Sequence, residues 1–206
     1  MTSPARPFMR PFILGLTGSI GMGKSAVAQM LRDLDVPVFD ADAAVHRLQS
    51  AGSPLLDRIE AAFPGSTGPD GVRRQELGAQ VFGDRDALAR LEAIMHPAVG
   101  AERAAFLADH ADAPLVVFDI PLLYEKGHGE GLDAVAVVSA PLAMQRDRVL
   151  ARPGMTEARF AQILALQVPD AEKRARATYV IDTGVALAET AAAVAALVAV
   201  LRARAR

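Results

Sequence analysis

The stretch "ILGLTGSIGMGKSAVAQML", residues 13–31, decides the fold of this 206-residue chain. Within it, Gly18, Gly23, Lys24 and Ser25 satisfy the pattern G-x-x-x-x-G-K-[ST]. A short apolar run precedes the pattern directly, and a helix-forming run follows it directly. A strand, a glycine-rich turn and a helix in this order predict a phosphate-binding loop.

Each residue type in the loop has a chemical reason. Glycines at 18, 21 and 23 let backbone N–H groups turn toward phosphate oxygens, and the following helix directs its positive end at them. We expect Lys24 to reach the β- and γ-phosphates of ATP and the Ser25 hydroxyl to hold Mg²⁺. The alternative is a glycine-rich turn that only caps a helix.

Composition limits the partners of the chain. It is 51% apolar and 22% charged, with a formal net charge of -2, so no global positive field attracts nucleic acid or an anionic membrane. Zero cysteines exclude disulfides, thiolate metal sites and cysteine nucleophiles, and they suit a reducing cytoplasm. The apolar run Ala191 to Leu201 is about half of the ~20 residues that span a bilayer. We therefore expect a cytoplasmic protein, a monomer or weak homo-oligomer, that binds neither nucleic acid nor membrane.

Short apolar runs separated by helical stretches predict an α/β fold, a P-loop kinase core with a parallel five-stranded sheet flanked by helices. The predicted strands are Phe12 to Thr17, Val36 to Asp40, Leu115 to Asp119, Ala134 to Val138 and Tyr179 to Asp182.

About seventy residues lie between the second and third predicted strands, far more than one crossover needs. We interpret 43–112 as a helical substrate-binding insertion with "FPGSTGPDG", 63–71, as its longest flexible loop. Its predicted helical segments are Ala43 to Arg47, Leu55 to Ala62, Arg74 to Phe82, Ala87 to Met95 and Val99 to Asp109. The nucleotide-binding core is predicted at 11–42, 113–145 and 169–206, with a small lid at 146–168.

The class of phosphate-loop protein follows from what the chain lacks and contains. A regulatory GTPase needs an [NT]-K-x-D segment, yet the chain has no asparagine, and Lys126 and Lys173 both follow a glutamate. A motor or helicase ATPase is usually larger and needs coupling elements that we do not find. A small-molecule kinase fits the size, the insertion and the arginines, because such enzymes close an arginine-bearing lid over the phosphates.

The lid prediction rests on "QRDRVLARPGMTEARFAQILALQ". Arg148 and Arg152 are four residues apart and are expected on one helix face, where they would clamp phosphate charge. Pro153 with the next glycine is expected to end that helix, and Thr156 to cap the following one. A solvated basic face is the alternative. Surface positions are expected for a further basic run, Lys173, Arg174 and Arg176.

Acidic residues follow two predicted strands, at the sheet edge where ligands bind in open parallel sheets. Asp40 and Asp42 point to opposite sides if the chain stays extended, so only one of them faces the γ-phosphate. We predict that Asp42 accepts the proton of an attacking hydroxyl, although it is also suited to be a helix N-cap. Asp119 is predicted to hold Mg²⁺ directly or through water.

Three further residues are candidates for substrate binding. Leu122 and Leu123 follow Pro121, which turns the chain out of the sheet, so they either pack or contact substrate. His96 precedes a proline within the insertion, where it either contacts an anionic substrate or is structural.

Taken together, these residues resemble the dephospho-coenzyme A kinase family from about Ile13 to Gly184. The motifs that carry the resemblance, in order, are "TGSIGMGKS", "FDADAAVHRLQSAGSP", "MHPAV", "DIPLLYE", "RVLAR" and "ATYVIDTG". The resemblance implies ATP-dependent phosphorylation of the ribose 3′-hydroxyl of dephospho-coenzyme A, with a phosphate-loop core, a helical substrate domain and a lid. Another nucleotide or small-metabolite kinase of the same fold is the alternative.

Carried over by position, the resemblance implies roles for individual residues. Thr17 and Asp42 match substrate-site groups, and Arg148 and Arg152 match the lid arginines. The ATP loop corresponds to Gly21, Met22, Gly23, Lys24, Ser25 and Ala26. Met22 stands where serine or threonine is common, and we expect it to contribute mainly its backbone N–H. Pro153 stands where many relatives carry an acidic residue, which affects how the lid closes.

Overall fold

The computed structural model describes residues 10–127 and 129–204. These residues form two compact units. One is Asp40–Asp109, called the helical unit below, and the other comprises the described residues on either side of it, called the core unit. The sequence placed the insertion at 43–112. No helix in the described part of the chain is long and apolar enough to cross a membrane.

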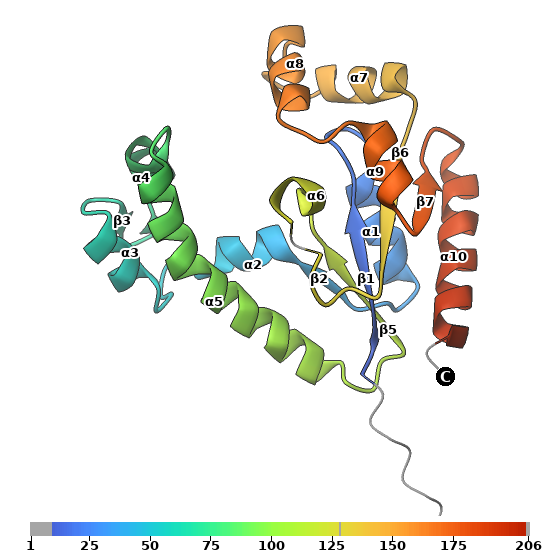
Figure 1. The fold of residues 1–206 in the computed structure, drawn as a ribbon, viewed down its shortest axis with the longest axis horizontal. Helices are drawn as coiled ribbons and strands as arrows, with labels where there is room; N and C mark the ends of the chain where they lie inside the picture. Colours follow the sequence, from blue (N-terminus) through green and yellow to red (C-terminus); the bar gives the residue numbers. More distant parts are fainter. Residues whose placement is uncertain (1–9, 128, 205–206) are drawn as a thin grey trace, which may run out of the picture. The chain divides into compact units, whose positions relative to one another are not determined.

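Five strands form the sheet of the core unit (Figure 1). They are β1 (Phe12–Thr17), β2 (Val38–Asp40), β5 (Leu115–Asp119), β6 (Ala134–Ser139) and β7 (Tyr179–Asp182), in the spatial order β2-β5-β1-β6-β7. The pairs β1–β5, β1–β6 and β6–β7 are parallel, and Leu16 lies opposite Asp119. The predicted α/β fold with a parallel five-stranded sheet is confirmed, and its register brings the carboxyl ends of β1 and β5 together.

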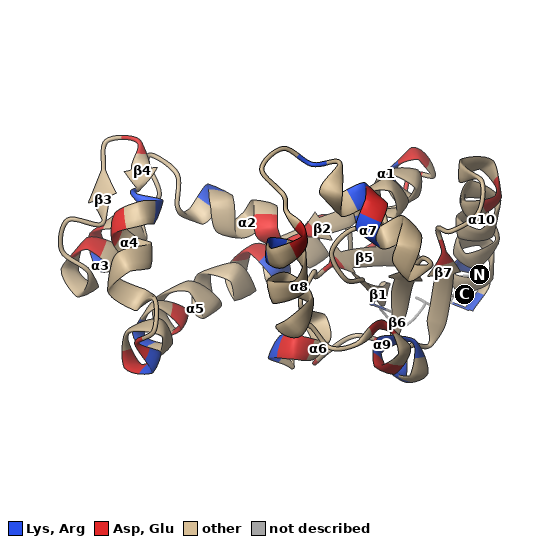
Figure 2. Ribbon diagram, turned by 90° about the horizontal axis from the view of Figure 1, so that it is seen from above, with Lys and Arg blue, Asp and Glu red and all other residues tan. Residues whose placement is uncertain are grey.

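Helices cover the sheet because its strands are apolar on both faces. Figure 2 shows α1 and α9 on opposite sides of the sheet, and α1 packs against α10. The helices of the core unit are α1 (Lys24–Asp33), α6 (Leu123–Lys126), α7 (Leu142–Leu150), α8 (Glu157–Ala165), α9 (Asp170–Arg176) and α10 (Leu187–Arg204). Buried residues of β1, α1, β5, β6 and α10 form one continuous hydrophobic core.

The helical unit has a core of its own. Its elements are α2 (Ala41–Leu48), α3 (Leu56–Ala62), the hairpin strands β3 (Thr67–Gly68) and β4 (Gly71–Val72), α4 (Arg74–Val81) and α5 (Arg85–Asp109). Ile59, Phe63, Leu77, Ile94 and Met95 are buried together between α3, α4 and α5. This unit therefore holds its shape by packing that is local to the insertion.

The prediction of two separate helices, Ala87 to Met95 and Val99 to Asp109, is wrong, because α5 runs unbroken from Arg85 to Asp109 through Pro97. A proline inside a helix removes one backbone hydrogen bond and costs about 3 kcal/mol or more. Burial of Ile94 and Met95 just before it, and packing of α5 on α2, α3 and α4, offset that penalty.

The loop 63–71 is more ordered than its glycine and proline content predicted. β3 and β4 pair antiparallel across it, with Thr67 opposite Val72. The Glu60 carboxylate of α3 accepts hydrogen bonds from the N–H of Gly65 at 2.6 Å and of Thr67 at 2.9 Å. The Thr67 hydroxyl donates a third hydrogen bond to it at 2.7 Å. A single carboxylate therefore fixes the start of this hairpin.

Candidate active site

The phosphate loop connects β1 to the first turn of α1. Gly21 and Gly23 have φ angles of 76° and 87°, in the left-handed region that favours glycine. A Cβ on Gly21 would also lie 2.5 Å from Cγ2 of Val149 in α7. Both conformation and space therefore require glycine, and the backbone that they allow is the one that turns N–H groups toward a phosphate.

Met22 contacts the rest of the core unit through its side-chain packing, its sulfur atom and its carbonyl group. Its side chain is buried in the hydrophobic core, and its Sδ accepts a hydrogen bond from the N–H of Ala140 at 3.2 Å. Its carbonyl accepts a hydrogen bond from the Thr183 hydroxyl at 2.7 Å. The side chain therefore anchors the loop, which goes beyond the backbone role that the sequence suggested.

Lys24 and Asp119 meet beside the loop. Lys24 begins α1, Asp119 ends β5, and their Nζ and Oδ1 atoms lie 2.5 Å apart with side chains that are 18% and 6% exposed. Ser25 and Ala26 follow in the first turn of α1 and are exposed. The predicted donor-site residues Lys24, Ser25 and Asp119 thus belong to two adjacent segments, α1 and β5.

No cluster of three or more His, Asp or Glu side chains suited to a metal exists among residues 10–127 and 129–204. A hydroxyl and a carboxylate at Ser25 and Asp119 are the hard oxygen donors that Mg²⁺ prefers. Mg²⁺ bound by few protein groups keeps water and phosphate oxygens as its other ligands. The residues present fit that kind of site.

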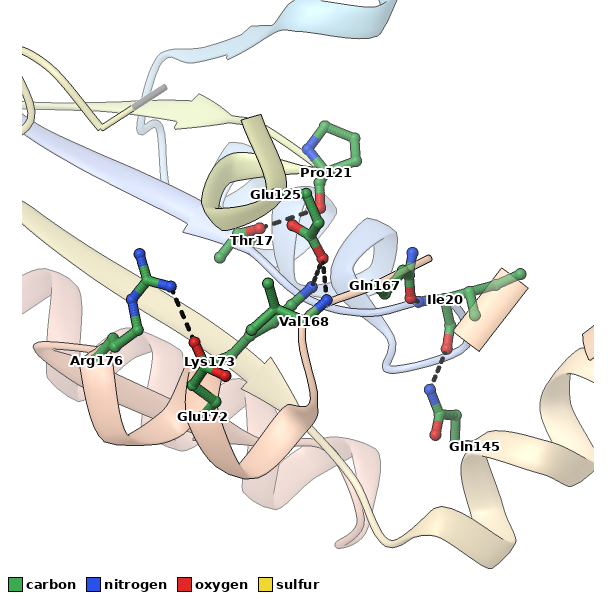
Figure 3. A network of polar contacts seen from close by, with 10 residues as sticks. All are labelled: Thr17, Ile20, Pro121, Glu125, Gln145, Gln167, Val168, Glu172, Lys173 and Arg176. Carbon is green, nitrogen blue, oxygen red and sulfur yellow. Dashed lines mark hydrogen bonds and ion pairs between the residues drawn. The ribbon is translucent and has the colours of Figure 1, made fainter. Parts of the chain in front are cut away.

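Thr17 and the segment after β5 are joined. Thr17 is buried at the end of β1, and its hydroxyl donates a hydrogen bond to the carbonyl of Pro121 at 3.2 Å (Figure 3). Leu122 is half-buried, whereas Leu123 is buried. A Cβ on Gly15 would meet Cδ1 of Leu123 at 3.6 Å, so Leu123 packs on β1, which is one of the two roles that the sequence left open.

The predicted arginine pair does not share a helix face, because α7 ends at Leu150 and Arg152 lies beyond it. Arg148 donates hydrogen bonds to the carbonyl of Thr183 at 2.7 Å and to its hydroxyl at 3.3 Å, whereas Arg152 is exposed. The Thr156 hydroxyl does cap α8, accepting from the N–H of Arg159 at 3.2 Å. The two arginines thus have different environments.

Two glutamines that the sequence did not single out hold the loop. Nε2 of Gln145, in α7, donates to the Ile20 carbonyl at 2.7 Å, and Oε1 of Gln167 accepts from the Ile20 N–H at 3.1 Å. Gln145 is an uncharged residue within α7 and Gln167 lies in the connection between α8 and α9, so neither belongs to a recognisable motif. Only burial of Gln145, a polar residue among apolar ones, distinguishes it.

The expectation that Lys173 lies at the surface is wrong. Although α9 is a charged helix in Figure 2, the Lys173 side chain is 0% exposed, and its Nζ lies 2.7 Å from Oε1 of Glu125. Burial by itself raises the pKa of Glu125, but hydrogen bonds from Lys173 and from the Val168 N–H, with the Lys173 charge, outweigh it and lower the pKa. Glu125 is therefore a carboxylate at neutral pH.

In the helical unit, Asp40 and Asp42 lie in the same pocket, which corrects the expectation of opposite sides. The chain does not stay extended after β2: α2 begins at Ala41, and Oδ1 of Asp40 accepts a hydrogen bond from the Ala43 N–H at 2.8 Å. Asp40 is therefore the N-cap, and Asp42 lies in the first turn with its side chain exposed. The pocket, about 430 Å³, is lined by Asp40, Asp42, Ala43, His46 and Arg47.

His96 lies inside α5, directly before Pro97, and is exposed. The sequence did not single out His46 and Arg47, which share the pocket with the two aspartates. The available signal was helical spacing: His46 comes four residues after Asp42, and Arg47 comes four residues after Ala43, and residues four apart lie on one side of an α-helix.

A parallel α/β sheet, a glycine loop at the end of its central strand and a lysine–aspartate pair beside that loop define a P-loop kinase. The family model described as "Dephospho-CoA kinase" matches residues 12–189. A dephospho-CoA kinase of Novosphingobium aromaticivorans is 72% identical over 193 residues, covering 94% of this chain and 96% of that protein. The chain therefore belongs to the dephospho-CoA kinase family.

Solved structures agree on the fold. The crystal structure of TT1252 from Thermus thermophilus is 37% identical, with a TM-score of 0.81, and the match covers 92% of this chain and 97% of that one. A dephospho-CoA kinase from Campylobacter jejuni has a TM-score of 0.62 at 22% identity, over 93% of this chain and 97% of that one. At that identity the second likeness shows the fold alone.

Proposed function

We propose that this chain transfers the γ-phosphoryl group of ATP to the 3′-hydroxyl of the ribose of dephospho-coenzyme A, giving coenzyme A and ADP, the final step of coenzyme A synthesis. The observation that carries the proposal is the phosphate loop with its Lys24–Asp119 pair in a member of this family. The absence of cysteine suits action in the cytoplasm. We expect the protein to act there as a monomer or weak homo-oligomer.

On the donor side, the loop backbone and the start of α1 bind the phosphates of ATP. Lys24 exchanges its contact with Asp119 for the β- and γ-phosphates, where its charge stabilises the transferring group. Ser25 and Asp119 would hold Mg²⁺, which neutralises phosphate charge when bound. Asp119, once released from Lys24, would offer its carboxylate to the ion.

On the acceptor side, Asp42 orients the ribose hydroxyl and accepts its proton. Its carboxylate is exposed in the pocket, whereas Oδ1 of Asp40 is already bonded to the Ala43 N–H. Positioning is the larger part of catalysis where the transition state is loose, so proton removal can come late. The helical unit serves as the substrate domain and contributes His96, while Leu122 of the core unit is a further substrate contact.

The segment 146–168 is the lid, and Arg148 and Arg152 are its phosphate-binding arginines. Arg148 is held on Thr183, so it is already oriented, while the exposed Arg152 gains its contacts as the lid closes. The two guanidinium groups would stabilise most strongly the negative charge that develops on the phosphoryl group during its transfer.

The test is ADP release by the purified protein with ATP, Mg²⁺ and one acceptor at a time. Dephospho-coenzyme A should give turnover, and nucleosides, nucleotides and sugars should give far less. Equal or better turnover with a nucleotide or another metabolite would reassign the acceptor within the same fold. No ADP release with any hydroxyl acceptor would contradict kinase activity altogether.

A further inference from the structure

Lys173, one of only three lysines in the chain, lies where lysine is rarely found. Its side chain is 0% exposed, and that of its partner Glu125 is 10% exposed. Removing two charges from water is strongly unfavourable unless their geometry is fixed by each other and by further hydrogen bonds. The ion pair joins α6 to α9, and neither residue contacts a phosphate or the acceptor in the phosphoryl transfer described above.

The same carboxylate oxygen holds a third segment. Oε1 of Glu125 accepts a hydrogen bond from the Val168 N–H at 2.9 Å in addition to the contact with Lys173 at 2.7 Å (Figure 3). Oε2 of Glu125 has no hydrogen-bond partner among the described residues. The polar contacts of the Glu125 carboxylate with Lys173 and Val168 are therefore both made by Oε1. Val168 lies between α8 and α9, at the end of the lid segment.

Gln167, the residue before Val168, is hydrogen-bonded to the phosphate loop. Gln167 accepts the Ile20 N–H at 3.1 Å, and Gln145, just before the lid segment, donates to the Ile20 carbonyl at 2.7 Å. Figure 3 shows both glutamines at Ile20 and the Glu125–Lys173 pair at the adjacent Val168. The two ends of the lid segment thus meet at one loop residue.

We propose that Glu125 and Lys173 are positioning residues for phosphoryl transfer: their buried pair fixes the hinge Gln167–Val168 and, through Gln167, the Ile20 region of the phosphate loop. This inference rests on the proposed function for its catalytic consequence. The pair joins the segment that follows Asp119 to the base of the lid, so the loop, the acidic strand end and the lid keep one geometry. A displacement of about 1 Å at a reacting group can cost about 10²-fold in rate.

The experiment uses the full chain with Glu125→Gln and Lys173→Met together. Removing one partner would leave the other charge buried and unpaired, and could unfold the protein, whereas the double variant replaces the pair by uncharged side chains of similar size. The matched control is Glu172→Gln, which removes an exposed ion pair with Arg176 one residue away. Steady-state ADP production gives kcat and the KM values for ATP and dephospho-coenzyme A.

The double variant should lose about 10- to 100-fold in kcat with a smaller change in either KM, and Glu172→Gln should change neither. A Gln167→Met background separates positioning from general destabilisation. Because Glu125 and Lys173 act through Gln167, removing the pair should lower kcat much less in that background than in the wild type. Equal losses in both backgrounds, or a kcat within twofold of wild type, would overturn the proposal.

Amide hydrogen exchange at Ile20 in the ligand-free protein tests the joint without any substrate. The Ile20 N–H should exchange at least tenfold faster in the double variant than in the wild type, and at an unchanged rate in Glu172→Gln. Unchanged exchange at Ile20 would overturn the proposal even if activity fell. A wild-type protein that is inactive with dephospho-coenzyme A would contradict the proposed function instead, and the exchange rates would still decide whether the joint exists.

Discussion

The proposed donor site in the core unit and the proposed acceptor pocket in the helical unit are built from different groups. The donor site is made of backbone and of a Lys24–Asp119 pair whose side chains are largely buried. The pocket proposed for the acceptor is open, and its two aspartates are Asp40, which is the N-cap of α2, and Asp42, which is exposed in the first turn. A backbone-built site recognises what all phosphate donors share, whereas a side-chain-built pocket can be specific for one acceptor.

The largest effect should come from the donor side. Lys24→Ala removes a charge from the β- and γ-phosphates and should reduce turnover by about three orders of magnitude. The measurement is kcat by ADP release. Lys24→Arg is the matched variant, because it keeps the charge and loses the geometry, and it should recover only part of the loss.

A thermal melt accompanies both Lys24 variants. Lys24→Ala leaves the buried Asp119 without this partner, so some loss of stability is expected from desolvation of that carboxylate. Lys24→Ala/Asp119→Asn should restore the melting temperature and stay inactive. Near-full activity of Lys24→Ala would contradict the assignment of the donor site.

The acceptor side should show the next effect. Asp42→Asn keeps the size and hydrogen-bonding capacity of the side chain but removes its basicity, so turnover should fall by about 10²-fold or more. Asp40→Asn is the control, since asparagine is as good an N-cap as aspartate and Oδ1 of Asp40 already serves the Ala43 N–H. Steady-state kinetics with dephospho-coenzyme A compares the two.

The outcome for the two aspartates decides which of them carries the acceptor. Both line the same pocket, so their position alone does not separate them. A larger loss for Asp40→Asn, with an unchanged melt, would transfer the role to Asp40. Activity retained in both variants would place the acceptor chemistry elsewhere, with Asp119 the next candidate.

Sequence reasoning described the core unit well because its signals are local. The phosphate-loop pattern carries its own backbone conformation, and three predicted strands, Phe12 to Thr17, Leu115 to Asp119 and Tyr179 to Asp182, have the observed bounds. Parallel strands buried on both faces also read as continuous apolar runs. The alternation of such strands with helical stretches along the chain then predicts a parallel sheet.

Two of the errors have the same physical cause, which is that tertiary contacts outweighed local preference. Pro97 predicted a helix break, but packing on both sides keeps α5 continuous. Lys173 resembled a solvated charge because its partner, Glu125, is 48 positions away in the sequence. Asp42 resembled an N-cap, whereas the chain turned into α2 two residues earlier than that role requires. The amino-acid type and immediate sequence neighbours of these residues do not indicate such contacts.

A smaller effect is expected in the lid. Arg152→Ala should lower kcat by about 10- to 100-fold and change the KM for dephospho-coenzyme A little, because its charge is needed most during transfer. Arg148→Ala should lower kcat similarly and also lower the melting temperature, since Arg148 holds the Thr183 carbonyl. Arg146→Ala is the control: this exposed arginine of α7 pairs with Glu157. Unchanged turnover in both Arg148→Ala and Arg152→Ala would return them to the status of surface charges.

The smallest effect concerns stability and belongs to the helical unit alone. Hydrogen bonds from the N–H of Gly65 and from the hydroxyl and N–H of Thr67 hold the pKa of Glu60 below its usual value of 4.5. A carboxylate whose pKa is lowered on folding stabilises the native state above its unfolded pKa, and that contribution is lost as the pH falls through the lower native value. Glu60→Gln should therefore lower the urea midpoint at pH 7, and the difference from wild type should shrink toward pH 3.

Glu76→Gln, at an exposed carboxylate of α4, is the control and should show little pH dependence of this kind. Turnover at pH 7 should change little, because Glu60 belongs neither to the proposed donor site nor to the pocket of Asp40 and Asp42. A difference between wild type and Glu60→Gln that stays constant from pH 7 to pH 3 would mean that the hairpin depends on the shape of this side chain rather than on its charge.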